Sequence, residues 1–165
     1  MLSTCLEPLA RSDARILILG SLPGQMSLQL GQYYAKPQNA FWRIMATTFH
    51  FSPDLPYPDR VAELQNHKIA AWEVCASAFR PGSLDSNISQ VVVNDFKSFF
   101  KTHPSIQLIC FNGKTAEKLY RRNVLPTLPK PFSEIPTRSL PSTSPAHAGI
   151  TFAEKLAQWK PALTE

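Results

Sequence analysis

Short apolar runs constrain the fold of this chain more than any other feature. Residues 16–19 are branched and apolar, are too few for a helix, and stop at Gly20, which predicts a strand buried on both faces. Residues 68–74 and 106–111 have the same character, and residues 134–140 form a weaker fourth run. The sequence therefore predicts four strands that each end in a turn.

Helical spacing of apolar residues separates these runs. The periodic positions fall into four groups: Phe41, Ile44, Met45 and Thr48; Val61, Leu64 and Gln65; Val92, Phe96, Phe99 and Phe100; and Ala116, Leu119 and Tyr120. A last helix is expected from about Thr151 to Trp159, before Pro161. Strands that alternate with helices imply a parallel sheet covered on both sides. We predict an α/β fold, a three-layer sandwich with a four-stranded, mostly parallel sheet flanked by helices, in a single domain over residues 1–165.

The composition argues against a secreted, membrane-bound or metal-dependent protein. Three cysteines, Cys5, Cys75 and Cys110, are widely separated, and two of them lie in apolar stretches, which suits reduced thiols in a cytosolic protein. No apolar run approaches the roughly 18 residues of a membrane span, and no signal-peptide pattern opens the chain. We expect a cytoplasmic protein of the bacterial or archaeal type, with no metal and no cofactor.

The positive charge is concentrated in one stretch. Residues 96–138 contain eight Lys and Arg against two Glu, an excess of six that is larger than the net charge of +5 of the whole chain. Such an asymmetry favours a polyanionic partner, because Lys and Arg that neutralise phosphates release condensed counterions. A solvated basic helix face is the alternative explanation. The basic residues are Lys97, Lys101, Lys114, Lys118, Arg121, Arg122, Lys130 and Arg138.

Parallel sheets place ligand sites beyond the carboxyl ends of their strands, where Gly20, Asn112 and Leu140 are expected to meet. Residues 20–24, GSLPG, match neither a nucleotide-hydrolase phosphate loop nor a dinucleotide-binding loop. This turn can present backbone amides and carbonyls to a closely approaching ligand, or it can be a plain connection. Residues 121–148 carry six prolines, too many for the interior of a helix, which suits an ordered, stiff surface loop.

Five sequence blocks occur in an order that is similar to one enzyme family. They are GSLPG at 20–24, YYAKPQNAFW at 33–42, RPGSLDS at 80–86, FNG at 111–113 and LPSTSP at 140–145. In this order they resemble the uracil-DNA glycosylase superfamily and, within it, the hypoxanthine-DNA glycosylase branch. The resemblance extends over nearly the whole chain. It implies a domain without metal or organic cofactor that acts on double-stranded DNA containing a deaminated base.

The resemblance implies roles for two amide side chains. Relatives of the mispaired-uracil branch carry an Asn at the third position of the first turn that orients the attacking water, whereas this chain has Leu22 there. The hypoxanthine branch implies that Asn39 takes over this catalytic task, although its side chain can equally cap the helix beginning near Phe41. Asn112 matches the base-binding Asn, since an amide offers a donor and an acceptor to a flipped base. An Asn before Gly at a strand end is also ordinary turn chemistry.

Further residues of these blocks are expected around the base and the DNA. The expected base pocket consists of Ser21, Phe41 and Asn112, with turn backbone from Gly20, Leu22, Pro23 and Gly24. Phe41 is expected to stack on the base, or else to pack in the core. The loop expected to enter the minor groove contains Ser142, Ser144, Pro145, Ala146 and His147. His147 stands where the nearest pattern has Asn, and it suits a phosphate contact or a plain loop position. Arg80, Ser83 and Asp85 suit either a phosphate contact or a structural turn.

Together these features predict a monofunctional DNA glycosylase of base excision repair that hydrolyses the N-glycosidic bond of deaminated bases, with hypoxanthine favoured. The reaction builds positive charge on the sugar and negative charge on the leaving base, so amides that orient water and donate hydrogen bonds can suffice. A uracil or mispaired-uracil glycosylase and a non-catalytic damaged-DNA-binding relative are the alternatives. The sequence lacks the zinc ligands of a base deaminase and the Gly-x-Ser-x-Gly elbow of a serine hydrolase. We expect a monomer that binds DNA and no membrane.

Overall fold

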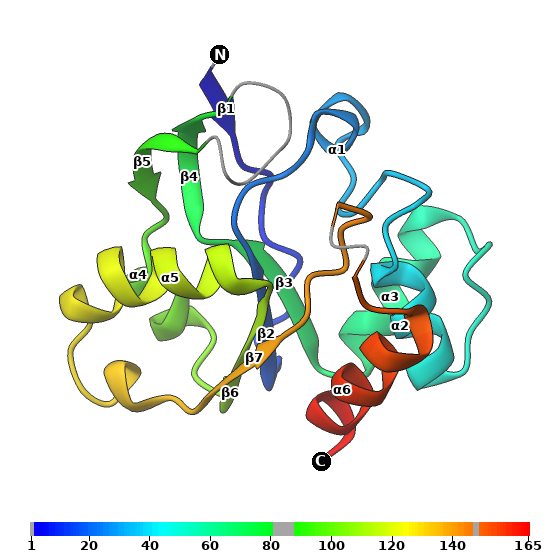
Figure 1. Ribbon diagram of the computed structural model, residues 1–165. Coiled ribbons are helices and arrows are strands. Elements are labelled where there is room, and N and C mark those ends of the chain that lie inside the picture. Colours follow the sequence, from blue (N-terminus) through cyan, green and yellow to red (C-terminus); the bar gives the residue numbers. More distant parts are fainter. Residues whose placement is uncertain (1, 81–87, 147–148) are drawn as a thin grey trace.

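A four-stranded parallel sheet forms the centre of the protein (Figure 1). The computed structural model describes residues 2–80, 88–146 and 149–165. The strand order is β3-β2-β6-β7, and every neighbouring pair is parallel. The predicted α/β class is thereby confirmed, and this sheet is wholly rather than mostly parallel. Its strands are β2 (Ile16–Gly20), β3 (Ile69–Glu73), β6 (Leu108–Asn112) and β7 (Thr137–Leu140).

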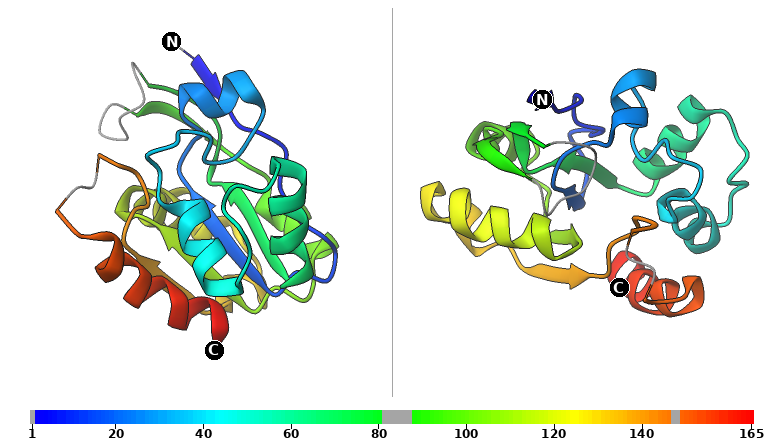
Figure 2. Two further views of the ribbon diagram at one scale, coloured as in Figure 1. Left: turned by 90° about the vertical axis from the view of Figure 1, so that its right-hand side faces the viewer. Right: turned by 45° about the horizontal axis from the view of Figure 1, so that its top comes forward.

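Helices cover both faces of this sheet. They are α2 (Phe41–Phe49), α3 (Tyr57–Asn66), α4 (Phe96–Thr102), α5 (Lys114–Asn123) and α6 (Phe152–Thr164). Leu17 and Leu19 of β2 pack on the face of α4 and α5, whereas Ile16 and Ile18 pack on the face of α2, α3 and α6. Figures 1 and 2 show these two groups of helices on opposite sides of the sheet. The alternating faces of β2 thus account for the three layers.

The start of α4 differs from its prediction. Val92 shares a helical spacing with Phe96, but it lies in β5 (Ser89–Val93). The Asp95 side chain accepts a hydrogen bond from the Ser98 amide (3.1 Å), so the helix begins after this cap. Three successive valines before the cap favour an extended strand.

The last helix continues beyond its predicted end. It begins at the capping box of Thr151 and Glu154, as expected, and it runs through Pro161. Ala162 and Leu163 of its final turn are 1% and 5% exposed and join the core beneath α2. This burial offsets the hydrogen bond that Pro161 cannot donate.

A second, smaller sheet is not predicted by the sequence pattern. Its antiparallel order is β1-β4-β5, with β1 (Leu2–Thr4) and β4 (Cys75–Phe79). Only Val74 separates β4 from β3, so the chain leaves the parallel sheet directly after the predicted run. The sequence CASAF of β4 lacks branched residues, and therefore it carries no strand signal. The helix α1 (Gln25–Leu30) and two short 3₁₀ turns, Leu125–Thr127 and Phe132–Glu134, complete the fold.

The three thiols are free, and we expect them to differ in reactivity. Cys75 and Cys110 are buried, whereas Cys5 is half-buried. Burial raises the pKa of the Cys110 thiol to about 12, so almost no reactive thiolate forms at this site at pH 8. In titration with a thiol-specific disulfide reagent, Cys5 is expected to react first, and the fast phase is expected to vanish in Cys5→Ser. Equal rates for all three thiols in the folded protein contradict this account.

Candidate active site

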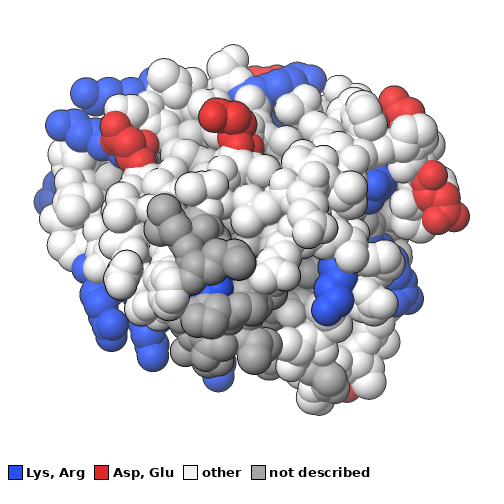
Figure 3. Space-filling view, turned by 90° about the horizontal axis from the view of Figure 1, so that it is seen from above, with Lys and Arg blue, Asp and Glu red and all other residues white. Residues whose placement is uncertain are grey.

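The carboxyl ends of the parallel strands bring the predicted motifs together. In the strand register, Asn112 lies beside Leu140 and Gly20 lies beside Glu73, while β2 and β6 pair directly between them. Figure 1 shows the segments that follow these strands gathered at the top of the molecule, and Figure 3 views that end. The three motifs therefore share one edge of the sheet, as the parallel arrangement predicts.

Hydrogen bonds to backbone carbonyls hold the turn after β2. The Gly20 and Ser21 carbonyls accept from the amides of Val74 (2.8 Å) and Cys75 (3.1 Å). Gly24 ends the turn as the N-cap residue of α1. Ser21, an expected base-pocket residue, is 6% exposed. The first half of the turn is thus fixed to the junction of β3 and β4.

Arg80 fixes the second half of the same turn. It is 3% exposed, and its guanidinium donates to the carbonyls of Leu22 (3.3 Å) and Pro23. Carbonyl oxygens satisfy the donors of a buried guanidinium. Of the two roles expected for Arg80, the structural one is therefore observed. Ser83 and Asp85 lie outside the described residues.

Gly20 is required by a close approach within the protein. A Cβ at this position would lie 2.5 Å from the Glu73 Oε2 atom and 3.2 Å from the Tyr34 hydroxyl oxygen. Glu73 is 3% exposed, so its carboxylate cannot move into solvent to make room. Gly20 was expected to let a ligand approach closely. Instead, the side chains of Glu73 and Tyr34 occupy the space beside it, and they explain why the position requires glycine.

Leu22 is buried in a small apolar cluster. It is 6% exposed and packs with Cys75 and Ala78. An amide here would lose this packing and would need hydrogen-bond partners in an apolar surrounding. The packing of Leu22 in this cluster thus accounts for an apolar residue at the position where the mispaired-uracil branch has Asn.

Asn39 lies directly before α2. Its Oδ1 atom accepts from the amide of Phe41, the first residue of α2 (2.9 Å), so it satisfies one free N–H at the helix start from the position before the N-cap residue, Ala40. The adjacent Ala40 amide donates to the Thr143 carbonyl (2.9 Å), and this bond joins the segment to the loop after β7. The side chain is half-buried. An amide that caps through one lone pair keeps a second lone pair and two N–H donors, so capping and water binding are compatible.

Phe41 is a core residue whose face is already covered. It is 0% exposed, and the Tyr34 ring stacks on it with centroids 4.0 Å apart and planes inclined by 18°. Trp159 meets it edge-on at 6.5 Å. Tyr34 is half-buried and has φ +53°, a left-handed conformation that is uncommon for a bulky residue. The core alternative for Phe41 is therefore observed, and Tyr34 takes the place expected for a stacked base.

Asn112 pairs with Thr143 through both polar atoms of its amide. Its Nδ2 atom donates to the Thr143 hydroxyl (3.0 Å), and its Oδ1 atom accepts from the Thr143 amide (2.9 Å). The two residues are 9% and 1% exposed. Gly113 follows with φ +97°, and a Cβ there would lie 3.1 Å from the Cβ atom of Ser142. The end of β6 and the loop after β7 therefore fit closely together.

The loop after β7 is braced by its own hydroxyls and by α6. The Trp159 indole N–H donates to the Pro141 carbonyl (2.9 Å), and the Lys155 ammonium donates to the Ser144 carbonyl (3.4 Å). Burial lowers the pKa of Lys155. The Ser142 and Ser144 hydroxyls each accept from a backbone amide two residues ahead (3.1 and 3.2 Å). The proline-rich range 121–148 is thus not one loop as predicted, because it contains the end of α5, two 3₁₀ turns and β7, and the hydroxyl-braced loop begins only after Leu140.

The outer part of this loop carries small side chains. Pro145 is half-buried and Ala146 is exposed. His147 lies outside the described residues. Small, stiff segments lose little conformational entropy when they enter a groove, so the form of the loop suits insertion into DNA.

A basic helix face lies beside the strand ends. All eight Lys and Arg of residues 96–138 are exposed. In α5, Lys114, Lys118 and Arg122 recur every four residues and share one face. Arg121 is paired with Glu117 (2.9 Å). Figure 3 shows Lys and Arg mainly around the rim of this end of the molecule, most of them on the side of α4 and α5.

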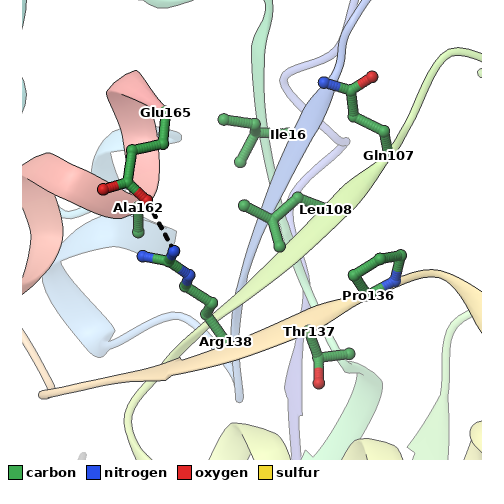
Figure 4. Close-up of a pocket in the computed structure, with 8 residues that line it drawn as sticks. All are labelled: Ile16, Gln107, Leu108, Pro136, Thr137, Arg138, Ala162 and Glu165. Carbon is green, nitrogen blue, oxygen red and sulfur yellow. Dashed lines mark hydrogen bonds and ion pairs between the residues drawn. The ribbon is translucent and has the colours of Figure 1, made fainter.

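Two cavities lie away from the carboxyl ends of the strands. One of about 350 Å³ lies at the amino end of the sheet, where the Arg138–Glu165 ion pair (2.8 Å) borders it (Figure 4). Another of about 180 Å³ lies between α2 and Phe152. None of the expected site residues lines either cavity, in agreement with the covered face of Phe41.

Within residues 2–80, 88–146 and 149–165, no group of His, Cys, Asp and Glu is suited to hold a metal. No helix in the described part of the chain is long and apolar enough to span a membrane.

The sequence pattern does not reveal the contacts of three residues at this edge. Thr143 lies inside the block 140–145, and only its branched hydroxyl side chain among serines and prolines sets it apart. Tyr34 lies in the block 33–42, and its contact with Phe41 is not predicted because the residues between them do not form a helix. Lys155 is the one buried lysine among the described residues, and nothing in the surrounding helix pattern marks it.

Comparison with known proteins agrees with these motifs. The model of the uracil DNA glycosylase superfamily matches residues 8–162. Proteins named hypoxanthine DNA glycosylase from Methanosarcina acetivorans and Methanosarcina barkeri are 38% and 35% identical over 63% and 65% of this chain. The match spans 66% and 68% of those relatives, about two thirds of their length.

A solved structure extends the comparison to the whole chain. The solution NMR structure of a proposed uracil DNA glycosylase from Methanosarcina acetivorans has a TM-score of 0.81 and 30% identity. It covers 100% of both chains. The family that the five blocks resemble and the fold predicted from the alternating strands and helices are confirmed. The chain therefore belongs to the uracil DNA glycosylase superfamily.

Proposed function

We propose that this protein is a monofunctional DNA glycosylase of base excision repair that removes deaminated bases, with hypoxanthine as its preferred substrate. One observation carries the proposal: at the carboxyl edge of the sheet, Thr143 bonds both to Asn112 and to the residue that follows Asn39. The two amides expected at the site thus belong to one hydrogen-bonded unit. The names of the two Methanosarcina relatives support hypoxanthine. The basic face of α5 supports DNA as the partner.

The chemistry assigned to the site needs no strong base. Water attacks the anomeric carbon of the deoxyribose, the bond from this carbon to the base nitrogen breaks, and its electron pair leaves with the base. One proton of the water is then released, and the departing base takes up a proton. Asn39 orients the water through the lone pair that its cap leaves free. Asn112 holds the base at the end of β6, and the hydrogen bond stabilises the leaving charge.

A flipped base requires a change at Tyr34. Its ring now lies on Phe41, where a planar base would otherwise stack. Tyr34 is half-buried whereas Phe41 is fully buried, so of the two stacked rings that of Tyr34 is the one able to turn aside. We assign Tyr34 to the opening of the base pocket, after which Phe41 offers its face to the base.

The enzyme is proposed to work as a monomer in the cytoplasm of a bacterium or archaeon. The three free thiols suit a reducing compartment. A sedimentation experiment tests the monomer, since a dimer gives a mass near twice 18.4 kDa.

Single-turnover cleavage tests the activity. Labelled duplexes that contain one hypoxanthine, uracil, xanthine or normal base are incubated with excess protein in EDTA, and hot alkali then breaks abasic sites. The expected result is strand breakage at hypoxanthine first. Breakage at uracil first would keep the glycosylase and change its substrate. Tight, salt-sensitive binding with no breakage at any base would overturn the proposal in favour of a binding protein.

The basic face of α5 is expected to contribute to binding without reading the sequence. Changing Lys118 and Arg122 together to Gln is expected to weaken binding of damaged and undamaged duplexes alike. The slope of log affinity against log salt is expected to become shallower by about one unit for each phosphate that the variant no longer neutralises. Fluorescence anisotropy at several salt concentrations measures both effects. Lys160→Gln, at an exposed position of α6, is the matched control, and an equal effect there contradicts the assignment.

A further inference from the structure

We propose that Lys155 of α6 binds a phosphate of the DNA strand that carries the extruded nucleotide, once the loop after β7 has entered the minor groove. The inference rests on the proposed function, because it takes this loop as the part of the protein that displaces the nucleotide. It adds a contact that the basic face of α5 does not supply, since it forms only where a nucleotide has left the stack.

The burial of Lys155 sets it apart from the other lysines. It is 5% exposed, whereas Lys160 of the same helix is exposed. An ammonium taken out of water loses its hydration, so lysine is almost never buried unless a partner offsets this cost. Burial accordingly lowers the pKa of Lys155. A cation at this position therefore needs a compensating interaction.

The protein itself offers this cation little compensation. Its Nζ atom donates to the Ser144 carbonyl at 3.4 Å, well beyond the roughly 2.7–2.9 Å of a good hydrogen bond between an ammonium and an anionic oxygen. Within residues 2–80, 88–146 and 149–165, no carboxylate forms an ion pair with it. The buried guanidinium of Arg80, by contrast, donates to two carbonyls. The three N–H groups of Lys155 thus retain donors for an anionic ligand.

The place of Lys155 identifies this anion. Ser144 belongs to the loop that is proposed to enter the DNA, which Figure 1 shows in orange above α6. The minor groove is only about 6 Å wide and phosphates border it on both sides, so a loop within it brings the ammonium bonded to its carbonyl close to a phosphate. The lysine stem is flexible and its present contact is long, so the ammonium is able to exchange the carbonyl for a phosphate oxygen.

This contact differs from those of α5 in the duplexes that it recognises. Lys118 and Arg122 are exposed, so they meet any duplex that approaches. Lys155 is buried, and it meets a phosphate only after the loop has filled the place of an extruded nucleotide. The face of α5 therefore raises the affinity for every duplex, whereas Lys155 raises it for a duplex with a missing or extruded base.

Binding of two duplexes of one sequence tests the inference. One carries a stable abasic analogue, which leaves the gap that the loop fills, and the other is undamaged. Lys155→Met keeps much of the stem and removes the charge, so the affinity for the abasic duplex is expected to fall about 10-fold, the effect of one charged hydrogen bond, with little change for the undamaged duplex. The salt slope for the abasic duplex is expected to become shallower by about one unit. Lys160→Met is the matched control and is expected to change neither quantity.

A measurement on the wild-type protein makes the test independent of any effect of the substitution on folding. The carbon-13 shift of Lys155 Cε reports the pKa of the ammonium, and Lys155→Met identifies the signal. This pKa is expected to rise when the abasic duplex binds, because a phosphate favours the charged form, and to stay unchanged with the undamaged duplex.

The outcomes separate this inference from the proposed function. An unchanged affinity in Lys155→Met, an equal loss for both duplexes, or an unchanged pKa in the abasic complex overturns the inference and leaves the glycosylase standing. A wild-type protein that breaks no strand at any deaminated base contradicts the proposed function itself, whatever Lys155 binds.

Discussion

Replacing Asn39 with Ala is expected to lower the single-turnover rate of hypoxanthine release by roughly 10²- to 10³-fold, because the attacking water loses the group that orients it. Binding of the damaged duplex is expected to stay within a few-fold of the wild type, since the base contact proposed for Asn112 is untouched. Loss of the bond from Asn39 to the Phe41 amide is also expected to cost about 1 kcal/mol of stability.

A second variant separates these two roles of Asn39. Serine is also a good helix cap, so Asn39→Ser is expected to restore most of the stability that Asn39→Ala loses. Its shorter hydroxyl does not reach the place of the amide, so the rate is expected to stay low. Recovery of rate and stability together in Asn39→Ser means that Asn39 only caps α2, and the catalytic assignment then fails.

Replacing Arg80 with Met is expected to lower the free energy of unfolding by about 2 to 5 kcal/mol, the largest stability effect at this edge. The change leaves the carbonyls of Leu22 and Pro23 without the donors that now satisfy them, and each buried acceptor costs about 1 to 3 kcal/mol. Urea unfolding followed by circular dichroism measures the loss. The rate of base release is expected to fall as well, because the turn beside the site loses its anchor.

Matched changes define what the Arg80 result means. Arg80→Lys keeps the charge but lacks the planar fork, so an intermediate loss of stability is expected. Arg15 is exposed, and Arg15→Met is expected to change stability by less than about 0.5 kcal/mol. An Arg80→Met protein as stable as Arg15→Met shows that the turn holds itself, and it returns Arg80 to the phosphate role.

The layers and the place of the site follow from the sequence because both depend on local patterns. Residues 16–19 are apolar at every position, and only a strand buried on both faces suits so short a run. Parallel pairing then carries Gly20, Asn112 and Leu140 to one edge without further information. The second sheet does not follow, because the sequence of β4 lacks the branched residues that favour strands.

The contacts within the site do not follow from the sequence, because they join distant segments through single side chains. The bond between Asn112 and Thr143 spans 31 positions, and that between Arg80 and Leu22 spans 58. An Arg followed by Pro and Gly suggests a surface turn, yet Arg80 is buried and donates hydrogen bonds to backbone carbonyls. Phe41 illustrates the same point, since only the fold shows that Tyr34 covers it.

Release of the free base is the defining product of a monofunctional DNA glycosylase. A duplex with one hypoxanthine is incubated with the protein in EDTA, the DNA is removed, and chromatography with mass detection quantifies the small molecules. Free hypoxanthine is expected in equal amount to the abasic sites formed, with no release of adenine from a matched duplex. DNA that is bound but yields neither free hypoxanthine nor abasic sites contradicts the proposed function.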